Sequence, residues 1–395
     1  MQYPDSPFRI ALLANWVVVV SGRRMFEEFR KRPDDELSSG LNTQEVIQSP
    51  YILESPLVLD RYPGRIMKER FTARKLPDTV LEIIDEAKIA VPQRIAVKDN
   101  EWASVLVFPT MQQIVARTNN RAFVGLPLCR NEEFLSQGIA FTEHVMMDAV
   151  PLRLVPAFAR PYIAPFLSHT RRLTKRALPI VQPTIEARKR TLEELGEGWN
   201  DKPLILDRAV PKGESATVIT QRVLHLNFAS IHTTSSTLTH VIYHIAEKPD
   251  LLVPLREEIE VNIAADGWTA TALGKMRKLD SIIRETLRLN GLGLVVMQRV
   301  AARDSTLCDG TRIPRGTTVC ASAHQLHRDA PALENANVFD PFRFARMHAA
   351  AATEDDALKL QATTTSLEFL PFGHGPYAWC VYLRCHDGAA TNAKW

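Results

Sequence analysis

The chain has 395 residues, of which 45% are hydrophobic and 24% are charged, the composition of a globular protein with a large core, in one domain or two closely joined lobes. A net charge of +3 argues against a nucleic-acid partner, because proteins that bind nucleic acid usually carry a basic stripe. The five cysteines are odd in number and irregularly spaced, which indicates a reducing compartment without a disulfide framework: Cys129, Cys308, Cys320, Cys380 and Cys385.

The N-terminal part of the chain predicts short strands mixed with helices. Residues 1–7 have the character of neither a signal peptide nor a membrane anchor. The apolar run 10–20 is too short to cross a bilayer, and its β-branched end is typical of a buried strand. A helix is expected at 24–31, and from 64 to 130 helical periodicity alternates with a strand-like patch at 95–102.

Residues 151–200 are interrupted by repeated prolines and carry several basic pairs. This pattern indicates helices that the prolines break, with a solvated basic outer face. Three helices, a group of short strands and an Ala-rich, acidic surface insertion are predicted further along: helices at 216–246, 251–262 and 278–289, strands within 293–320, and the insertion at 346–365.

Three patterns in the C-terminal third can carry chemistry. Glu285 and Arg288 stand at i and i+3 on one helix face, a spacing that by itself usually gives a solvated surface pair. A second arginine, Arg343, lies in the segment Phe-Asp-Pro-Phe-Arg-Phe that ends at Phe344. A glycine-punctuated loop, Phe369-Leu-Pro-Phe-Gly-His-Gly-Pro-Tyr-Ala-Trp-Cys380, ends on a cysteine.

Together, and in this order, the three patterns resemble the cytochrome P450 haem-thiolate monooxygenases over nearly the whole chain. The resemblance implies a mainly α fold with a small β-lobe, incomplete at the C-terminus, and one haem-thiolate domain over residues 1–395. It also implies b-type haem (heme b), whose iron would take its axial thiolate from Cys380.

The resemblance assigns roles to further residues. Glu285, bracketed by the guanidinium groups of Arg288 and Arg343, would form a buried charge network that locks the loop below the haem. Phe372 would belong to that loop, and Arg299 would meet the haem carboxylates.

The predicted helix 216–246 contains Ala-Ser-Ile-His-Thr-Thr from Ala229. The family places small residues, an acid and an alcohol here, to admit O₂ and relay protons to it. The resemblance assigns the acid's place to His232, which can pass protons near neutral pH, and the alcohol's place to Thr233. The pattern is similar to that of a fungal branch typified by terpenoid oxidases such as ent-kaurene oxidase. The alternative is a Thr/Ser-rich helix whose hydroxyls bond back to i−4 carbonyls.

The cysteine of the loop stands one residue late. The family pattern Phe-x-x-Gly-x-x-x-Cys-x-Gly, begun at Phe372, puts Trp at position 379 and the cysteine at 380. Residues 379–395 form an aberrant tail without the apolar stripe of the helix that should follow and support the thiolate. Trp379-Cys380-Val381 can be encoded by TGGTGTGT, so a retained intron that begins inside codon 379 would explain the shift.

The function implied is an NADPH- and O₂-dependent monooxygenase that hydroxylates or oxidises an apolar small molecule, with a terpenoid of fungal secondary metabolism favoured. Electrons would come through an NADPH-cytochrome P450 reductase. The family works at the cytosolic face of the endoplasmic reticulum membrane. This chain shows no anchor, so a cytoplasmic location is expected unless an N-terminal anchor is missing from it.

Two alternatives stay open. One is a catalytically inactive, mis-spliced or truncated monooxygenase remnant. The other is a zinc knuckle of irregular spacing, built from four nitrogen and sulfur ligands: His374, Cys380, Cys385 and His386.

Overall fold

The computed structural model describes residues 6–12, 15–53, 76–97, 101–196, 213–328, 333–375 and 378. The chain divides into two compact units. Unit 1 comprises Met1–Val46, His240–Ala265 and Gly274–Arg384, and unit 2 comprises Ile47–Thr239, Asp266–Leu273 and Cys385–Trp395. The single-domain organisation expected from the sequence stays a prediction.

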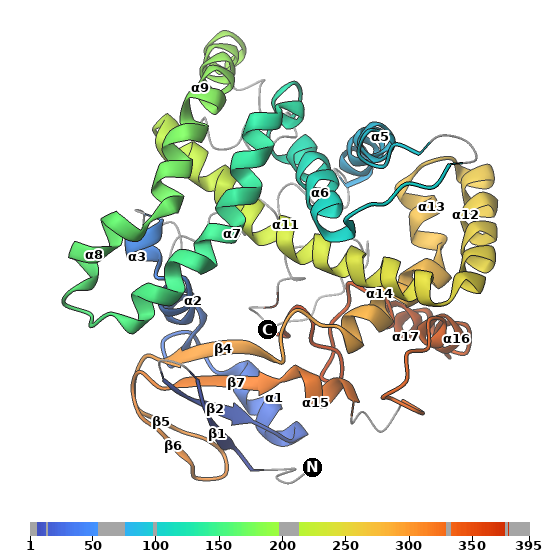
Figure 1. Cartoon of the computed structure of the whole chain (residues 1–395). Helices are drawn as coiled ribbons and strands as arrows, with labels where there is room; N and C mark the ends of the chain where they lie inside the picture. Colours follow the sequence, from blue (N-terminus) through green and yellow to red (C-terminus); the bar gives the residue numbers. More distant parts are fainter. Residues whose placement is uncertain are drawn as a thin grey trace. The chain divides into compact units, whose positions relative to one another are not determined.

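Unit 1 contains a five-stranded sheet in the order β1-β2-β7-β4-β3 (Figure 1). Its strands are β1 (Phe8–Ala11), β2 (Trp16–Val20), β3 (Leu37–Ser38), β4 (Val295–Ala301) and β7 (Thr318–Ser322). β2 and β7 pair in parallel with Val19 opposite Cys320, and the other pairs are antiparallel. The valines of β2 are buried on both faces of the sheet, which confirms the buried strand predicted there. A small hairpin of β5 (Ser305–Thr306) and β6 (Arg312–Ile313) turns at Gly310.

The helix α1 (Arg23–Lys31) packs Met25, Phe26 and Phe29 into the core of this sheet. Its residues follow the amphipathic pattern that predicted a helix at 24–31. The other helices that lie wholly or mostly in unit 1 are α2 (Ser39–Ile47), η5 (Pro249–Leu251), α12 (Leu252–Asp266), α14 (Arg277–Leu289), α15 (Ala323–Arg328), α16 (Arg343–Ala349) and α17 (Glu354–Leu358).

Every regular element in the described part of unit 2 is a helix. Its elements are α3 (Ser49–Ile52), α5 (Leu76–Arg94), α6 (Val107–Phe123), η2 (Leu128–Arg130), α7 (Glu132–Leu154), α8 (Arg160–Leu167), α9 (His169–Leu195), most of α13 (Ala270–Lys275), and α11 (Ala216–Glu247) up to Thr239. α7 and α9 pack side by side (Figure 1). Apolar residues of α6, α7, α9 and α11 form the core, among them Phe123, Phe134 and Ile231. The long helix predicted at 216–246 is confirmed to within one residue.

A buried charge cluster lies in this unit. Glu86 has no exposed surface and is bonded by Arg117 and by Arg130, whose Nη2 lies 2.8 Å from Glu86 Oε2. Burial alone would raise the pKa of Glu86, but the hydrogen bonds from the two guanidinium groups hold it below its usual value. The cluster therefore links α5 to α6 and η2.

One local prediction is wrong and a second holds only in part. The strand-like patch at 95–102 contains no strand among its described residues: α5 continues to Arg94, and residues 95–97 and 101–102 lie outside any helix or strand. The prolines of 151–200 break the helices only in part. Pro156 lies in the break between α7 and α8, whereas Pro151 lies inside α7, and Pro179 and Pro183 lie inside α9. A stripe of fully buried side chains, Ala177, Val181 and Ile185, anchors α9 through the prolines.

The segment 346–365, expected as a surface insertion, contributes to the packing of unit 1. It contains the end of α16 and all of α17, and Ala357 and Ala362 are buried. Ala362 N donates to both carboxylate oxygens of Asp280 on α14, at 3.1 and 3.0 Å. Only part of the segment therefore lies on the surface.

In the part of the chain that the structure describes, no helix is both long enough and apolar enough to cross a membrane.

Candidate functional site

Glu285 on α14 is the centre of a buried ion-pair network in unit 1. Its side chain has no exposed surface, and both of its oxygens accept from Arg288, each at 2.8 Å. Arg343 Nε donates to Glu285 Oε1 at 3.2 Å, and Asp340 N donates to the same oxygen at 3.1 Å. The pair is therefore not the solvated surface pair that the bare spacing suggests, and Arg288 and Arg343 do bracket Glu285 as expected.

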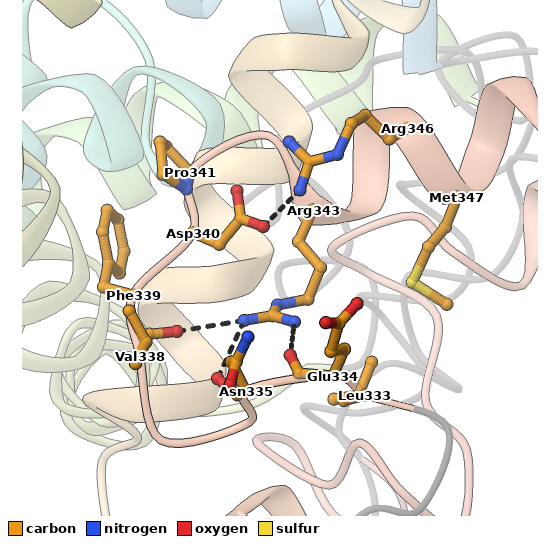
Figure 2. Close-up of a pocket in the computed structure, with 10 residues that line it drawn as sticks. All are labelled: Leu333, Glu334, Asn335, Val338, Phe339, Asp340, Pro341, Arg343, Arg346 and Met347. Atoms are coloured by element: carbon orange, nitrogen blue, oxygen red, sulfur yellow. Dashed lines mark hydrogen bonds and ion pairs between the residues drawn. The ribbon is translucent and has the colours of Figure 1, made fainter.

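The remaining guanidinium donors of this network hold backbone carbonyls. Arg343 donates to Glu334 O, and to Asn335 O and Val338 O at 3.2 and 3.0 Å, as Figure 2 shows. These residues line a hollow of about 520 Å³ whose rim carries the Arg346–Asp340 pair (Figure 2). The network thus fixes the fold of the segment from Leu333 to Arg343 around α14.

His327 connects the same helix to the glycine-rich loop, a link that sequence analysis missed. The side chain is 2% exposed; its Nδ1 donates to Arg288 O at 3.0 Å, and its Nε2 accepts from Leu370 N at 2.7 Å. Burial lowers the pKa of His327 to about 4, outweighing the hydrogen bond to Arg288 O that favours the charged ring. A neutral imidazole with one donor and one acceptor therefore spans α14 and the loop.

Arg284 is a second residue that sequence analysis missed. Its guanidinium carbon lies 3.9 Å from the ring centroid of Phe369, and its Nη1 donates to Gln361 O and, at 3.1 Å, to Thr364 O. Burial lowers its pKa to about 9, although Asp280 counteracts the shift. Arg284 and Thr364 are 80 residues apart in the sequence, and no local pattern predicts their contact.

The loop itself is built on two glycines. Gly373 and Gly375 have φ of +72° and +86°, a region that side chains rarely adopt. A Cβ on Gly373 would lie 3.3 Å from Met297 Cγ, and one on Gly375 would lie 3.5 Å from Arg30 O. Phe372, expected in this loop, lies in it and is half-buried. This tight, closely packed turn fits a loop that presents a ligand to a haem.

The expected ligand, Cys380, and the tail 379–395 lie outside the described residues, as do Cys385 and His386 of the zinc-knuckle alternative. Of the described cysteines, burial raises the pKa of Cys129 to about 11 and that of Cys320 to about 12. Both thiols are buried in the core, and without a metal each stays protonated at neutral pH. Cys308 is exposed, and a hydrogen bond to Glu28 raises the pKa of its thiol.

Arg299, expected to meet haem carboxylates, lies on β4 just after a bulge at which Met297 takes a positive φ. It is 1% exposed, and its Nη1 donates to Phe29 O at 3.1 Å and Arg32 O at 3.0 Å. These bonds cap the carbonyl end of α1. The haem-carboxylate role of Arg299 stays a prediction.

Thr233 and His232 lie on α11 in unit 2. Thr233 Oγ1 donates to Ala229 O at 3.0 Å and Ser230 O at 3.3 Å, the back-bonding of the alternative reading. His232 is exposed and meets the ring of Phe108 edge-on at 5.5 Å between centroids. Ser230 Oγ and Ser235 Oγ are buried without a hydrogen-bond partner in the described chain. Two hydroxyl groups near Thr233 in the sequence are therefore available to bond a water or ligand.

Comparison with known proteins covers nearly the whole chain. Residues 2–380 match the model of the family described as Cytochrome P450. The monooxygenase CYP512U6 of Ganoderma lucidum is 47% identical, over 95% of this chain and 74% of that protein. Cytochrome P450 monooxygenase 151 of Postia placenta is 37% identical, over 94% and 75%. An ent-kaurene oxidase of Gibberella intermedia is 29% identical, over 95% and 71%.

A solved structure agrees with the fold. The crystal structure of the cytochrome P450DA heme domain has a TM-score of 0.65 and 16% identity, and covers 98% of this chain and 81% of that one. The mainly α fold with a small β-lobe that the sequence predicted is thereby confirmed.

Proposed function

The chain belongs to the cytochrome P450 family of monooxygenases, and from that premise we propose a haem-thiolate enzyme that hydroxylates or oxidises an apolar small molecule. The observation that carries the proposal is the fully buried Glu285–Arg288–Arg343 network. A buried carboxylate is stable only when such partners neutralise it. Here Arg288 also holds the carbonyl of His327, whose ring accepts from Leu370 N of the glycine-rich loop. That arrangement is what a rigid support for an axial ligand requires.

In this proposal Cys380 supplies the thiolate to b-type haem, and Phe372 packs in the loop beside it. A haem bound through a cysteine thiolate supplies the chemistry that activates O₂ for insertion into a C–H bond. Arg299 offers positive charge for the haem carboxylates while it caps α1. His327 holds the loop at Leu370, so that the ligand keeps a fixed direction.

Thr233 and His232 move protons. Thr233 Oγ1 donates a hydrogen bond to Ala229 O, so the lone pairs of the hydroxyl oxygen can accept a hydrogen bond from a water. Turning the hydroxyl by one rotamer lets it donate instead. His232, exposed on the same helix, is placed to exchange protons with solvent.

The substrate class is the finer part of the proposal. The Ala-x-x-His-Thr-Thr pattern of α11 and the similarity to an ent-kaurene oxidase support a terpenoid of fungal secondary metabolism. Electrons come from NADPH through a cytochrome P450 reductase, and the enzyme works at the cytosolic face of the endoplasmic reticulum, as its family does.

Turnover with a fungal reductase tests this proposal. The purified chain, NADPH and a panel of diterpenes, triterpenes and fatty acids should give a product that carries one oxygen atom from ¹⁸O₂. Thr233→Ala should consume NADPH without a matching amount of product, because proton delivery fails. Thr237→Ala is the matched control: this hydroxyl also bonds back one turn earlier, to Thr233 O at 3.1 Å, and its loss should leave coupling unchanged.

If only fatty acids are oxidised, the terpenoid substrate class is wrong, whereas the proposed monooxygenase reaction still holds. No product with any substrate, together with absent haem, would favour the inactive remnant, to which the late position of Cys380 points.

A further inference from the structure

A cluster of two histidines and one aspartate lies in unit 2. His144 and Asp148 stand one turn apart on α7, and His169 begins α9. Each side chain offers one ligand atom, and these atoms lie within 4.8 Å of one another. We propose that this cluster binds a divalent transition metal of the zinc class and joins α7 to α9.

Asp148 is the fixed member of the cluster. Its side chain is 3% exposed, and its Oδ2 accepts from the backbone N–H groups of His169 at 2.7 Å and Thr170 at 3.1 Å. The amides at the N-terminus of α9 therefore hold one carboxylate oxygen in place. The other oxygen, Oδ1, faces the two imidazole rings.

His144 supplies the observation that points to a ligand. Its Nδ1 is buried without a hydrogen-bond partner in the described chain, and it lies 3.8 Å from Asp148 Oδ1, too far for a hydrogen bond. A buried ring nitrogen without a partner lowers stability, because its hydrogen bond to water is lost and not replaced. A cation between Nδ1 and the carboxylate would satisfy it.

His169 completes the set and explains how an ion would enter. Its Nδ1 lies 2.9 Å from Asp148 Oδ1 and 3.0 Å from Leu167 O. Since both partners are acceptors, that nitrogen carries a proton, which a metal would replace. The His169 side chain is 48% exposed, so the site opens to solvent, and water can fill the remaining coordination position.

The rings of His144 and His169 are only partly arranged for metal coordination. They stack with centroids 4.5 Å apart and planes 14° from parallel. Ligand atoms about 2.0 to 2.1 Å from a tetrahedral ion lie roughly 3.3 Å apart, and nearly parallel lone pairs do not meet at one point. One ring must turn about its Cβ–Cγ bond, and the exposed His169 is the ring free to do so. Two imidazoles and a carboxylate are the ligands that zinc, cobalt and nickel accept.

Titration of the full-length chain with Zn²⁺, and with Co²⁺ as a spectroscopic probe, tests the site. Wild type should bind one more equivalent than His144→Ala or His169→Ala, with affinity reduced more than about tenfold in each variant. Zn²⁺ should raise the melting temperature of wild type and leave that of the two variants unchanged. Affinity should fall in acid, because protonated imidazole cannot bind a metal.

His348→Ala, which removes a histidine on α16 outside the cluster, is the control and should titrate as wild type does. The proposal fails if the two cluster variants bind Zn²⁺ with the stoichiometry and affinity of wild type; the cluster is then only a hydrogen-bonded cap of α9. If His144→Ala does not fold, His169→Ala decides alone, since its side chain is half-exposed. Haem content and turnover play no part in the readout, so this outcome is independent of the proposed function.

Discussion

Glu285 shows how a charged side chain can lie in a core. Two guanidinium groups and one backbone N–H surround its carboxylate, so its charge is neutralised and every oxygen is bonded. The Coulomb attraction offsets a large desolvation cost only while all partners are present. The structural role of this residue is therefore sensitive to the loss of any single partner.

Replacing Glu285 with Ala should prevent haem incorporation and lower the free energy of unfolding by about 3 to 5 kcal/mol, because two buried arginines lose their counter-charge. Haem absorbance per polypeptide and the midpoint of urea unfolding measure both effects. Asp356→Asn, which breaks the exposed pair with Lys359, is the control and should change neither. Normal haem loading in Glu285→Ala would show that the network is dispensable for the loop.

His327 offers a separate prediction for the loop. His327→Ala leaves Leu370 N and Arg288 O without partners in a buried site, so the loop should loosen and the haem ligand should be lost or exchanged more easily. The reduced-CO spectrum should show a smaller thiolate component. His327→Asn, which can both donate and accept, should restore part of it. Equal spectra for the two variants would contradict a positioning role and leave only packing.

Strong local patterns in the sequence were sufficient to predict individual helices and strands. Hydrogen bonds between residues far apart in the chain could not be predicted from it. α11 was predicted almost to the residue, because its helical pattern runs on until Lys248-Pro249 closes it. The buried strand β2 followed from its valines. His327 and Arg284 were missed because their partners lie tens of residues away along the chain, and a single sequence carries no record of such contacts.

The prolines of α9 led the sequence prediction astray for a physical reason. Each proline removes one N–H and crowds the carbonyl four residues earlier, which normally ends a helix. Here Val181 and Ile185 are fully buried on the same helix, and that packing outweighs the local cost. Replacing a proline of α9 should therefore increase the free energy of unfolding.

Pro183→Ala should therefore stabilise the protein by about 1 to 3 kcal/mol, since it restores an N–H that can bond Pro179 O. Pro183 is exposed, so no packing is lost. The melting temperature should rise by a few degrees, whereas Gln182→Ala at the neighbouring exposed position should leave it within error. A decrease in Pro183→Ala would indicate that the proline-bearing geometry is itself required.

At the scale of the whole molecule, each unit keeps a buried glutamate between two arginines: Glu285 in unit 1 and Glu86 in unit 2. Because the pKa of Glu86 is held low, its stabilisation is present above the ordinary glutamate pKa and is lost as pH falls through the folded value. Asp280, whose pKa burial raises, acts in the opposite direction and offsets part of that loss.

His327 and His225 contribute at milder pH, because burial lowers the pKa of each to about 4. The pKa of His327 falls from 6.5 to about 4 on folding, so the unfolded chain binds more protons in that interval and stability must decrease as pH falls through it. The loss approaches about 3 kcal/mol near pH 4. The urea midpoint between pH 7 and 4 should fall less steeply in His327→Asn than in wild type; parallel slopes would rule out this histidine as the source.

The central claim is that Cys380, at the end of the loop that His327 ties to α14, binds haem as a thiolate. The reduced-CO difference spectrum of the purified full-length chain tests it most directly. The account predicts the red-shifted Soret band of thiolate ligation, lost in Cys380→Ser and retained in Cys308→Ser, whose thiol is exposed and distant from the loop in sequence. A wild-type spectrum without that band, or one unchanged in Cys380→Ser, would contradict it.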